Sequence, residues 1–117
     1  MTYEDLLLVP YKENGRDARG MDCYGLVLEC CKRSGVNLRD VVYSTKELAS
    51  EAGRHVLDLG LIRVERPRFG SLIQCEYGGE LHIAFAVTKK VCIHMTYQGV
   101  RVTPISALVN PIFYEVQ

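Results

Sequence analysis

Residues 20–27 read Gly-Met-Asp-Cys-Tyr-Gly-Leu-Val and place Cys23 directly after Asp22, at the start of a segment with helical spacing. Asp22 is a favoured N-cap residue, and apolar side chains recur at helical intervals over residues 23–34 until Gly35. The unpaired N–H groups and the dipole at a helix N-terminus favour negative charge. We therefore expect a helix over 23–34 and a lowered pKa for the Cys23 thiol, as a nucleophile requires.

The pattern before and after this helix predicts the fold class. Capping signals at Thr2 and Ser44 predict a short helix over 3–8 and a second helix over about 46–59, while the polar residues 11–21 predict a loop. After residue 60 the apolar runs are short and alternating, which is typical of strands. These runs are 61–65, 71–77, 81–88, 91–96, 99–103 and 111–116.

Gly78-Gly79 separates two of these runs and predicts a tight hairpin. Helices followed by a meander of strands indicate an α+β fold. We expect N-terminal helices packed on an antiparallel sheet of about five or six strands. A chain of 117 residues is normally a single domain, which we expect to span 1–117.

Composition limits the classes of binding partner and the cellular compartment that we expect for this protein. The formal net charge is zero and basic residues are scattered, so nucleic-acid binding has no electrostatic support. Five cysteines without a C-x-x-C pair favour reduced thiols and a protein that is cytoplasmic when synthesised. The leucine run at 6–8 is short and follows Glu4 and Asp5, so we expect no signal peptide. No apolar stretch approaches the roughly 18 residues of a membrane span.

Two histidines lie on neighbouring predicted strands downstream of Cys23. In the strand over 81–88, His82 alternates with the apolar residues and shares a face with Ala84 and Ala86, small residues that let a helix end approach. His94 lies on the next strand. Adjacent antiparallel strands can bring these two imidazoles side by side. A cysteine, a base and an orienting group are the minimum set for acyl transfer by a thiolate.

This spacing resembles the NlpC-like family of bacterial and phage cell-wall cysteine endopeptidases. Asp22-Cys23-x-Gly25, a histidine on a strand, and a second histidine twelve positions later match its pattern. The segments 67–73 (Pro-x-x-Gly-Ser-Leu-Ile) and 82–87 (His-Ile-Ala-Phe-Ala-Val) resemble two of its strand starts. The resemblance extends over nearly the whole chain from Tyr11 onward. It implies a compact papain-like fold and hydrolysis of amide bonds in the stem peptides of peptidoglycan.

The resemblance also assigns roles by position. It makes Cys23 the nucleophile, His82 the general base and His94 the residue that orients the base, so that the enzyme is a cysteine endopeptidase with a Cys-His-His triad. Tyr11 matches a tyrosine whose hydroxyl lies near the oxyanion. The backbone N–H of Cys23 is a further oxyanion donor. No metal or organic cofactor is required.

The chain departs from the family pattern in the turn after Tyr11, where Gly15 is the one glycine, and at two further residues. Tyr24 follows the nucleophile where serine is common, and Ser71 replaces the aspartate of a Gly-Asp pair. A bulky aromatic residue at this position resembles variants found with phage tail and cell-wall-entry proteins. We therefore hold as a hypothesis that the chain belongs to a phage tail or cell-entry assembly and is virion-associated.

Three other readings stay open at this point. In the first, the domain is an inactive module with a structural or binding role, which the changes at Tyr24 and Ser71 favour. In the second, it is an amidase or acyltransferase of the same superfamily. Each histidine taken alone is more often a hydrogen-bonded strand residue. The third reading is a zinc site with four ligands. Its ligands would be Cys23, His82, Cys92 and His94.

Overall fold

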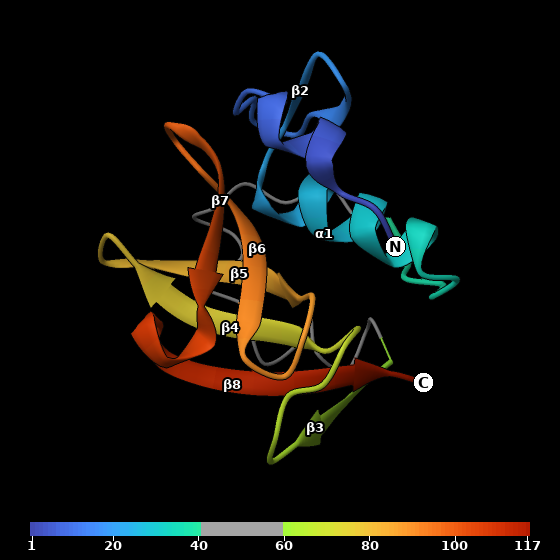
Figure 1. Cartoon of the computed structure of the whole chain (residues 1–117), viewed down its shortest axis with the longest axis vertical. Helices are drawn as coiled ribbons and strands as arrows, with labels where there is room; N and C mark the ends of the chain where they lie inside the picture. Colours follow the sequence, from blue (N-terminus) through green and yellow to red (C-terminus); the bar gives the residue numbers. More distant parts are fainter. Residues whose placement is uncertain (41–59) are drawn as a thin grey trace.

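The computed structural model of the chain describes residues 1–40 and 60–117, and Figure 1 shows the helix α1 (Cys23–Arg33) lying against a curled sheet. Six antiparallel strands form this sheet in the order β3-β8-β4-β5-β6-β7. The strands are β3 (Leu61–Val64), β4 (Leu72–Tyr77), β5 (Glu80–Ala86), β6 (Val91–Thr96), β7 (Gly99–Pro104) and β8 (Val109–Val116). The α+β class and the expected size of the sheet are confirmed. The predicted helix over 46–59 lies outside the described residues.

The helical and loop predictions before residue 40 are met only in part. Of the two helices predicted in this part of the chain, α1 (Cys23–Arg33) is an α-helix, whereas η1 (Glu4–Leu8) is a 3-10 helix. Such tight turns are common in short segments. Residues 11–21, expected as a loop, contain a two-stranded ribbon of β1 (Arg16–Asp17) and β2 (Gly20–Met21). A second 3-10 turn, η2 (Ile105–Ala107), joins β7 to β8.

The two ends of α1 lie where the sequence predicts them. The side chain of Asp22 accepts the Gly25 N–H at 2.7 Å, which satisfies one of the unpaired donors of the first turn. At the other end, Gly35 adopts a φ of 75°, and the Val36 N–H donates to the Cys31 carbonyl at 2.8 Å. This is the Schellman arrangement, in which a left-handed glycine closes the helix. Cys23 is therefore fixed at the first residue of the helix.

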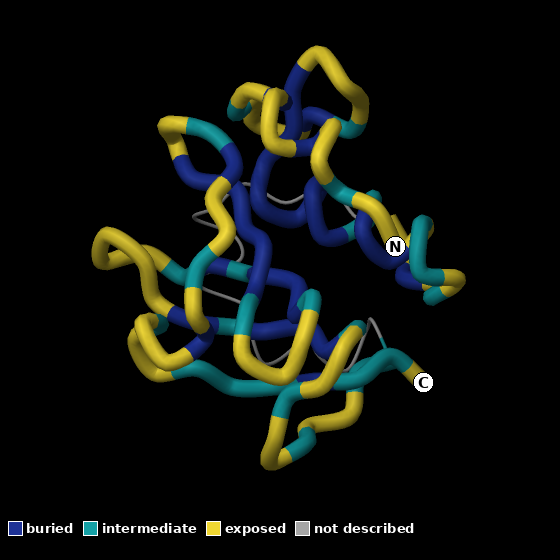
Figure 2. Tube along the Cα trace, viewed as in Figure 1, coloured by how far each residue is buried: buried dark blue, intermediate teal, exposed yellow. Residues whose placement is uncertain are grey.

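The core has two parts, one on each side of the sheet, and its buried segments are the dark blue parts of the tube in Figure 2. On the first side, α1 packs against Phe85 and Ile93 from β5 and β6. On the second side, Ala84 and Ala86 pack with Ile105 of η2. The expectation that these alanines admit the helix end is therefore wrong, because they pack in the second part of the core, whereas Ile83 and Phe85 of β5 pack in the part that contains α1.

Hairpin geometry sets the register of the strands that carry the histidines. Gly78 and Gly79 have φ angles of 59° and 80°, as a type I′ turn requires, and they pair Tyr77 with Glu80. This register places His82 opposite Cys75.

Among the described residues, no helix is long and apolar enough to cross a membrane.

Candidate active site

A small pocket brings three of the predicted site residues together. The N-terminus of α1 contributes Cys23, β5 contributes His82, and the segment before β1 contributes Tyr11. The pocket has a volume of about 30 Å³, which is room for about one water molecule. Its lining consists of Tyr11, Cys23, Tyr77, Glu80, Leu81, His82, Met95, Thr96 and Tyr97. Cys23 is 8% exposed and His82 is 9% exposed, and both line this opening.

His94 does not line the pocket and instead lies behind His82. The Nε2 atom of His82 and the Nδ1 atom of His94 are 2.9 Å apart, a hydrogen-bond distance. The two imidazoles are thus side by side, as the strand alternation predicts. On its far side, the Nε2 atom of His94 lies 2.9 Å from the hydroxyl of Thr103 on β7. A continuous polar chain runs from the pocket through both imidazoles to Thr103.

Sequence reasoning missed two residues of this site, Tyr77 and Thr103. The Tyr77 ring packs on both imidazoles, with centroid distances of 5.2 Å to His82 and 5.4 Å to His94. Each missed residue is two positions along the neighbouring strand from the direct partner of a histidine, because Cys75 pairs with His82 and Arg101 with His94. Diagonal neighbours of this kind are within reach of long or aromatic side chains. A prediction of strand register would have found both.

The protonation states of the site differ from the expectation. Burial raises the pKa of the Cys23 thiol to about 11, and the negative charge of Asp22 adds to the rise. Hydrogen bonds from the backbone, first of all from Ile83, offset this only in part. The expected lowering of the thiol pKa is therefore wrong, because the Asp22 carboxylate occupies the helix N-terminus and little solvent reaches the sulfur.

The imidazoles are held neutral as well. Burial, with a smaller contribution from the neighbouring His94, lowers the pKa of His82 to about 4. Burial also lowers the pKa of His94, with a contribution from the positive charge of Arg101. At neutral pH the resting site therefore holds a neutral thiol beside a neutral imidazole. Which ring donates the hydrogen bond between them depends on their tautomers.

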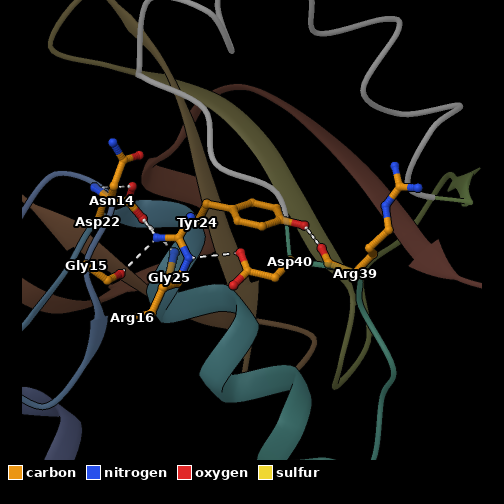
Figure 3. A network of polar contacts seen from close by, with 8 residues as sticks. All are labelled: Asn14, Gly15, Arg16, Asp22, Tyr24, Gly25, Arg39 and Asp40. Carbon is orange, nitrogen blue, oxygen red and sulfur yellow. Dashed lines mark hydrogen bonds and ion pairs between the residues drawn. The ribbon is translucent and has the colours of Figure 1, made fainter.

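A network around Asp22, drawn in Figure 3, ties the segment that carries Tyr11 to the start of α1. The buried Asp22 carboxylate accepts the Asn14 N–H at 3.0 Å and an Arg16 guanidinium N–H at 2.8 Å, besides the helix N–H at Gly25. Arg16 also donates to the Gly15 carbonyl at 2.8 Å and to Asp40 at 3.0 Å. These contacts hold the β1–β2 ribbon against the helix and so fix one wall of the pocket.

The departures from the family pattern at Tyr24 and Ser71 have structural roles. The Tyr24 hydroxyl donates to the Arg39 carbonyl at 2.5 Å, and the Arg16 guanidinium lies over the Tyr24 ring, 5.6 Å from its centroid. Tyr24 does not line the pocket. Ser71 is buried, and its hydroxyl accepts the Arg68 N–H at 2.9 Å, a turn contact that an aspartate can also make. Neither change obstructs the site.

The remaining cysteines behave as small core residues. Cys30 and Cys31 are buried on α1, and burial raises the pKa of each thiol. Cys75 and Cys92 are buried in the sheet, and all five cysteines are free. Within residues 1–40 and 60–117, no group of three or more His, Cys, Asp or Glu side chains is arranged to hold a metal ion. The four residues considered for zinc therefore do not form a ligand set.

Replacement of Asp22 by alanine is expected to lower the free energy of unfolding by about 2–3 kcal/mol, because it removes a helix cap and the carboxylate that pairs with the partly buried Arg16 guanidinium. Urea unfolding followed by circular dichroism measures this change. Asp22→Asn keeps an oxygen acceptor for the Gly25 N–H and should lose less. Equal losses in the two variants, or none in either, would contradict the capping role.

Comparison with known proteins supports the fold described above. The model of the NlpC/P60 family matches residues 8–115. The structure is similar to that of the NlpC/p60 domain of the peptidoglycan hydrolase SagA, with a TM-score of 0.61 and 22% identity over 98% of this chain and 92% of the other. A search of curated proteins found no match. The family match covers nearly all of the chain, and the chain therefore belongs to the NlpC/P60 family.

Proposed function

We propose that this chain is a cysteine endopeptidase that hydrolyses amide bonds in the stem peptides of peptidoglycan. The observation that carries the proposal is the single pocket lined by Cys23 and His82, with His94 hydrogen-bonded behind His82. Family membership and the likeness in fold to a domain of a peptidoglycan hydrolase supply the substrate class. Nucleophile, base and orienting group then come from three separate elements, α1, β5 and β6.

The hydrogen bond between the imidazoles decides which atom acts as the base. The Nε2 atom of His82 is engaged by His94, so Nδ1 is the ring nitrogen left to take the thiol proton. Because the resting pair is neutral, His82 takes the thiol proton as the sulfur attacks the carbonyl carbon. A carbon–sulfur bond forms and the carbonyl π bond opens to an oxyanion. The backbone N–H of Cys23 and the Tyr11 hydroxyl are its donors.

Collapse of the oxyanion breaks the carbon–nitrogen bond, and His82 gives its proton to the leaving amine. Water, deprotonated by the same imidazole, then attacks the thioester and releases the acid and the Cys23 thiol. His94 holds the ring plane of His82 through both steps. The proton count balances, and each transfer uses one nitrogen of one imidazole.

The shape of the pocket indicates how a peptide binds. The pocket is small, and Cys23 and His82 line it, so we expect the scissile carbonyl to enter while the chain lies across the mouth. Tyrosines 11, 77 and 97 form this mouth, with Tyr11 and Tyr97 in edge contact at 4.8 Å. Tyr97 donates to Glu80 at 2.7 Å, which holds the carboxylate at the rim. An aromatic rim of this kind favours an extended peptide.

Digestion of purified muropeptides tests the proposal. The full chain is incubated with them, and the products are identified by mass spectrometry, with an iodoacetamide-treated sample in parallel. We expect cleavage within the stem peptide, giving one new amine and one new carboxylate. Release of the whole stem would indicate an amidase, and capture of an added amine an acyltransferase. Intact muropeptides with a folded protein would overturn the proposal.

The alternative of an inactive module rests on Tyr24 and Ser71. Their contacts are with Arg39, Arg16 and Arg68, away from the pocket lining. Neither residue therefore favours the alternative.

A narrower proposal concerns the setting in which the domain acts. We propose that it belongs to a phage tail or cell-entry assembly, on the resemblance of Tyr24 to phage-associated variants. Mass spectrometry of purified phage particles tests this directly. Detection of the chain in the particle supports the proposal, and its confinement to the host cell contradicts it.

Replacing Tyr11 by phenylalanine is expected to lower kcat about 100-fold with little change in KM, because it removes an oxyanion donor that acts in the transition state. Initial rates on a stem peptide give both constants. Tyr97→Phe is the matched control, since that hydroxyl bonds to Glu80 at the rim. Equal losses of kcat in the two variants would contradict an oxyanion role for Tyr11.

A further inference from the structure

Thr103 closes the polar chain that begins at the pocket. Its hydroxyl lies 2.9 Å from the Nε2 atom of His94, whose Nδ1 atom is 2.9 Å from the Nε2 atom of His82. We propose that Thr103 is a positioning residue that fixes the tautomer of His94 and, through it, the tautomer of His82. The kinetic part of this inference rests on the proposed hydrolase activity. The direction of the tautomers rests on the proposed role of His82 as the base, whereas the contact of Thr103 with His94 does not and can be tested without substrate.

The position of each proton in this row of hydrogen bonds follows from the position of the one before it. For His82 to act as a base, its Nδ1 atom must carry no proton, so its one proton is on Nε2. That N–H donates to the Nδ1 atom of His94, which must then be bare. The proton of His94 is therefore on Nε2, and it donates to the hydroxyl oxygen of Thr103. Both hydrogen bonds therefore point from His82 towards Thr103, and the Thr103 hydroxyl accepts the second of them.

The reverse direction would disable the base. If the Thr103 hydroxyl donated to Nε2 of His94, the proton of His94 would move to Nδ1 and donate to Nε2 of His82. His82 would then carry its proton on Nδ1, the atom proposed to take the thiol proton, and could not accept another there. Both directions satisfy the two distances, so the acceptor role of Thr103 decides whether the site can work.

The surroundings of His94 keep its ring neutral, so Thr103 can change which ring nitrogen carries the proton but not the charge of the ring. His94 is 1% exposed and is enclosed by His82, the Tyr77 ring and Thr103. Arg101 is its direct partner on β7, and this positive charge opposes protonation of the ring. The remaining choice for a neutral imidazole is which nitrogen carries the proton. Within the described contacts, Thr103 is the group that engages Nε2 of His94.

The strand ladder fixes Thr103 independently of its hydroxyl. β6 pairs with β7 in antiparallel register, with Cys92 opposite Thr103. Valine has the same branched shape and a high preference for strands, so Thr103→Val removes the oxygen with little change in packing. Thr103→Ser keeps the hydroxyl. The pair separates the hydrogen bond from the shape of the side chain.

Nitrogen NMR of the imidazoles in the intact protein tests the tautomer without any substrate. Wild type and Thr103→Ser should both show His94 protonated at Nε2 and His82 protonated at Nε2. Thr103→Val should show a mixture, with part of the population protonated at Nδ1 of His94. Unchanged tautomers in Thr103→Val would overturn the inference, and so would a change in Thr103→Ser equal to that in Thr103→Val.

Kinetics supply the second measurement. Thr103→Val should lower kcat about tenfold and leave KM unchanged, while Thr103→Ser should stay within about twofold of wild type. Thr88→Val is the control, because the Thr88 hydroxyl accepts the N–H groups of Lys90 and Val91 in a turn without contact to the imidazoles. A loss of kcat in this control equal to that in Thr103→Val overturns the inference. If wild type itself does not hydrolyse stem peptides, the proposed function fails, and the NMR result still decides the role of Thr103.

Discussion

A Cys23→Ala variant is expected to lose at least about 10⁴-fold in kcat on stem peptides while it keeps the wild-type fold. The reason is that the variant has no atom to form the acyl-enzyme bond, so the pocket retains only its ability to bind and to stabilise the oxyanion. The fold should persist because Cys23 borders the pocket at the first residue of α1, where alanine is a good helix former. Initial rates and circular dichroism measure the two parts of this expectation.

Cys31→Ala is the matched control for a lost thiol on the same helix. Cys31 is 1% exposed in the core between α1 and the sheet, and it does not line the pocket. We expect this variant to lose about 1–2 kcal/mol in the free energy of unfolding and to keep its kcat. Residual hydrolysis at the wild-type rate in Cys23→Ala, or a loss in Cys31→Ala of similar size, would contradict the assignment of the nucleophile.

The parts of the structure that the sequence predicts best are those set by local signals. The N-cap at Asp22 and the glycine at position 35 bound α1 because each supplies a partner or a conformation that a helix end requires. Gly78 and Gly79 adopt positive φ angles, which two-residue hairpins need. The alternation of residues along β5 and β6 then brings His82 and His94 to hydrogen-bond distance. Each of these inferences needs only a few neighbouring residues.

What the sequence does not predict depends on packing between distant segments. Cys23 alone suggests a lowered thiol pKa, but the Asp22 carboxylate and the burial of the sulfur reverse the direction. Tyr77 and Thr103 join the site through strand register, which the sequence does not specify without the hairpin geometry. Tyr24 suggests a bulky cleft residue, yet its ring lies beneath Arg16. In each case the deciding partner is distant in sequence or is hidden from a reading of single residues.

A His82→Ala variant is expected to lose about 10⁴-fold in kcat, because it removes the group that takes the thiol proton and protonates the leaving amine. In wild type, the neutral imidazole is the active form. Since burial lowers the pKa of His82 to about 4, kcat/KM should stay level as pH falls through 6 and decline only near pH 4. Rates in a series of buffers at constant ionic strength measure this profile.

Unfolding must be separated from protonation in that experiment, and linkage gives the size of the effect. Below about pH 6.5, the unfolded chain binds a proton at His82 that the folded chain does not bind until about pH 4, so the lowered pKa costs stability as pH falls through this window. The full cost is about 3 kcal/mol. Circular dichroism at each pH identifies the points where the protein remains folded. Among those points, a decline of kcat/KM near pH 6.5 would contradict a buried neutral base. A loss of kcat/KM on the alkaline side near pH 8 to 9, typical of a charged thiolate–imidazolium pair, would contradict the neutral resting site.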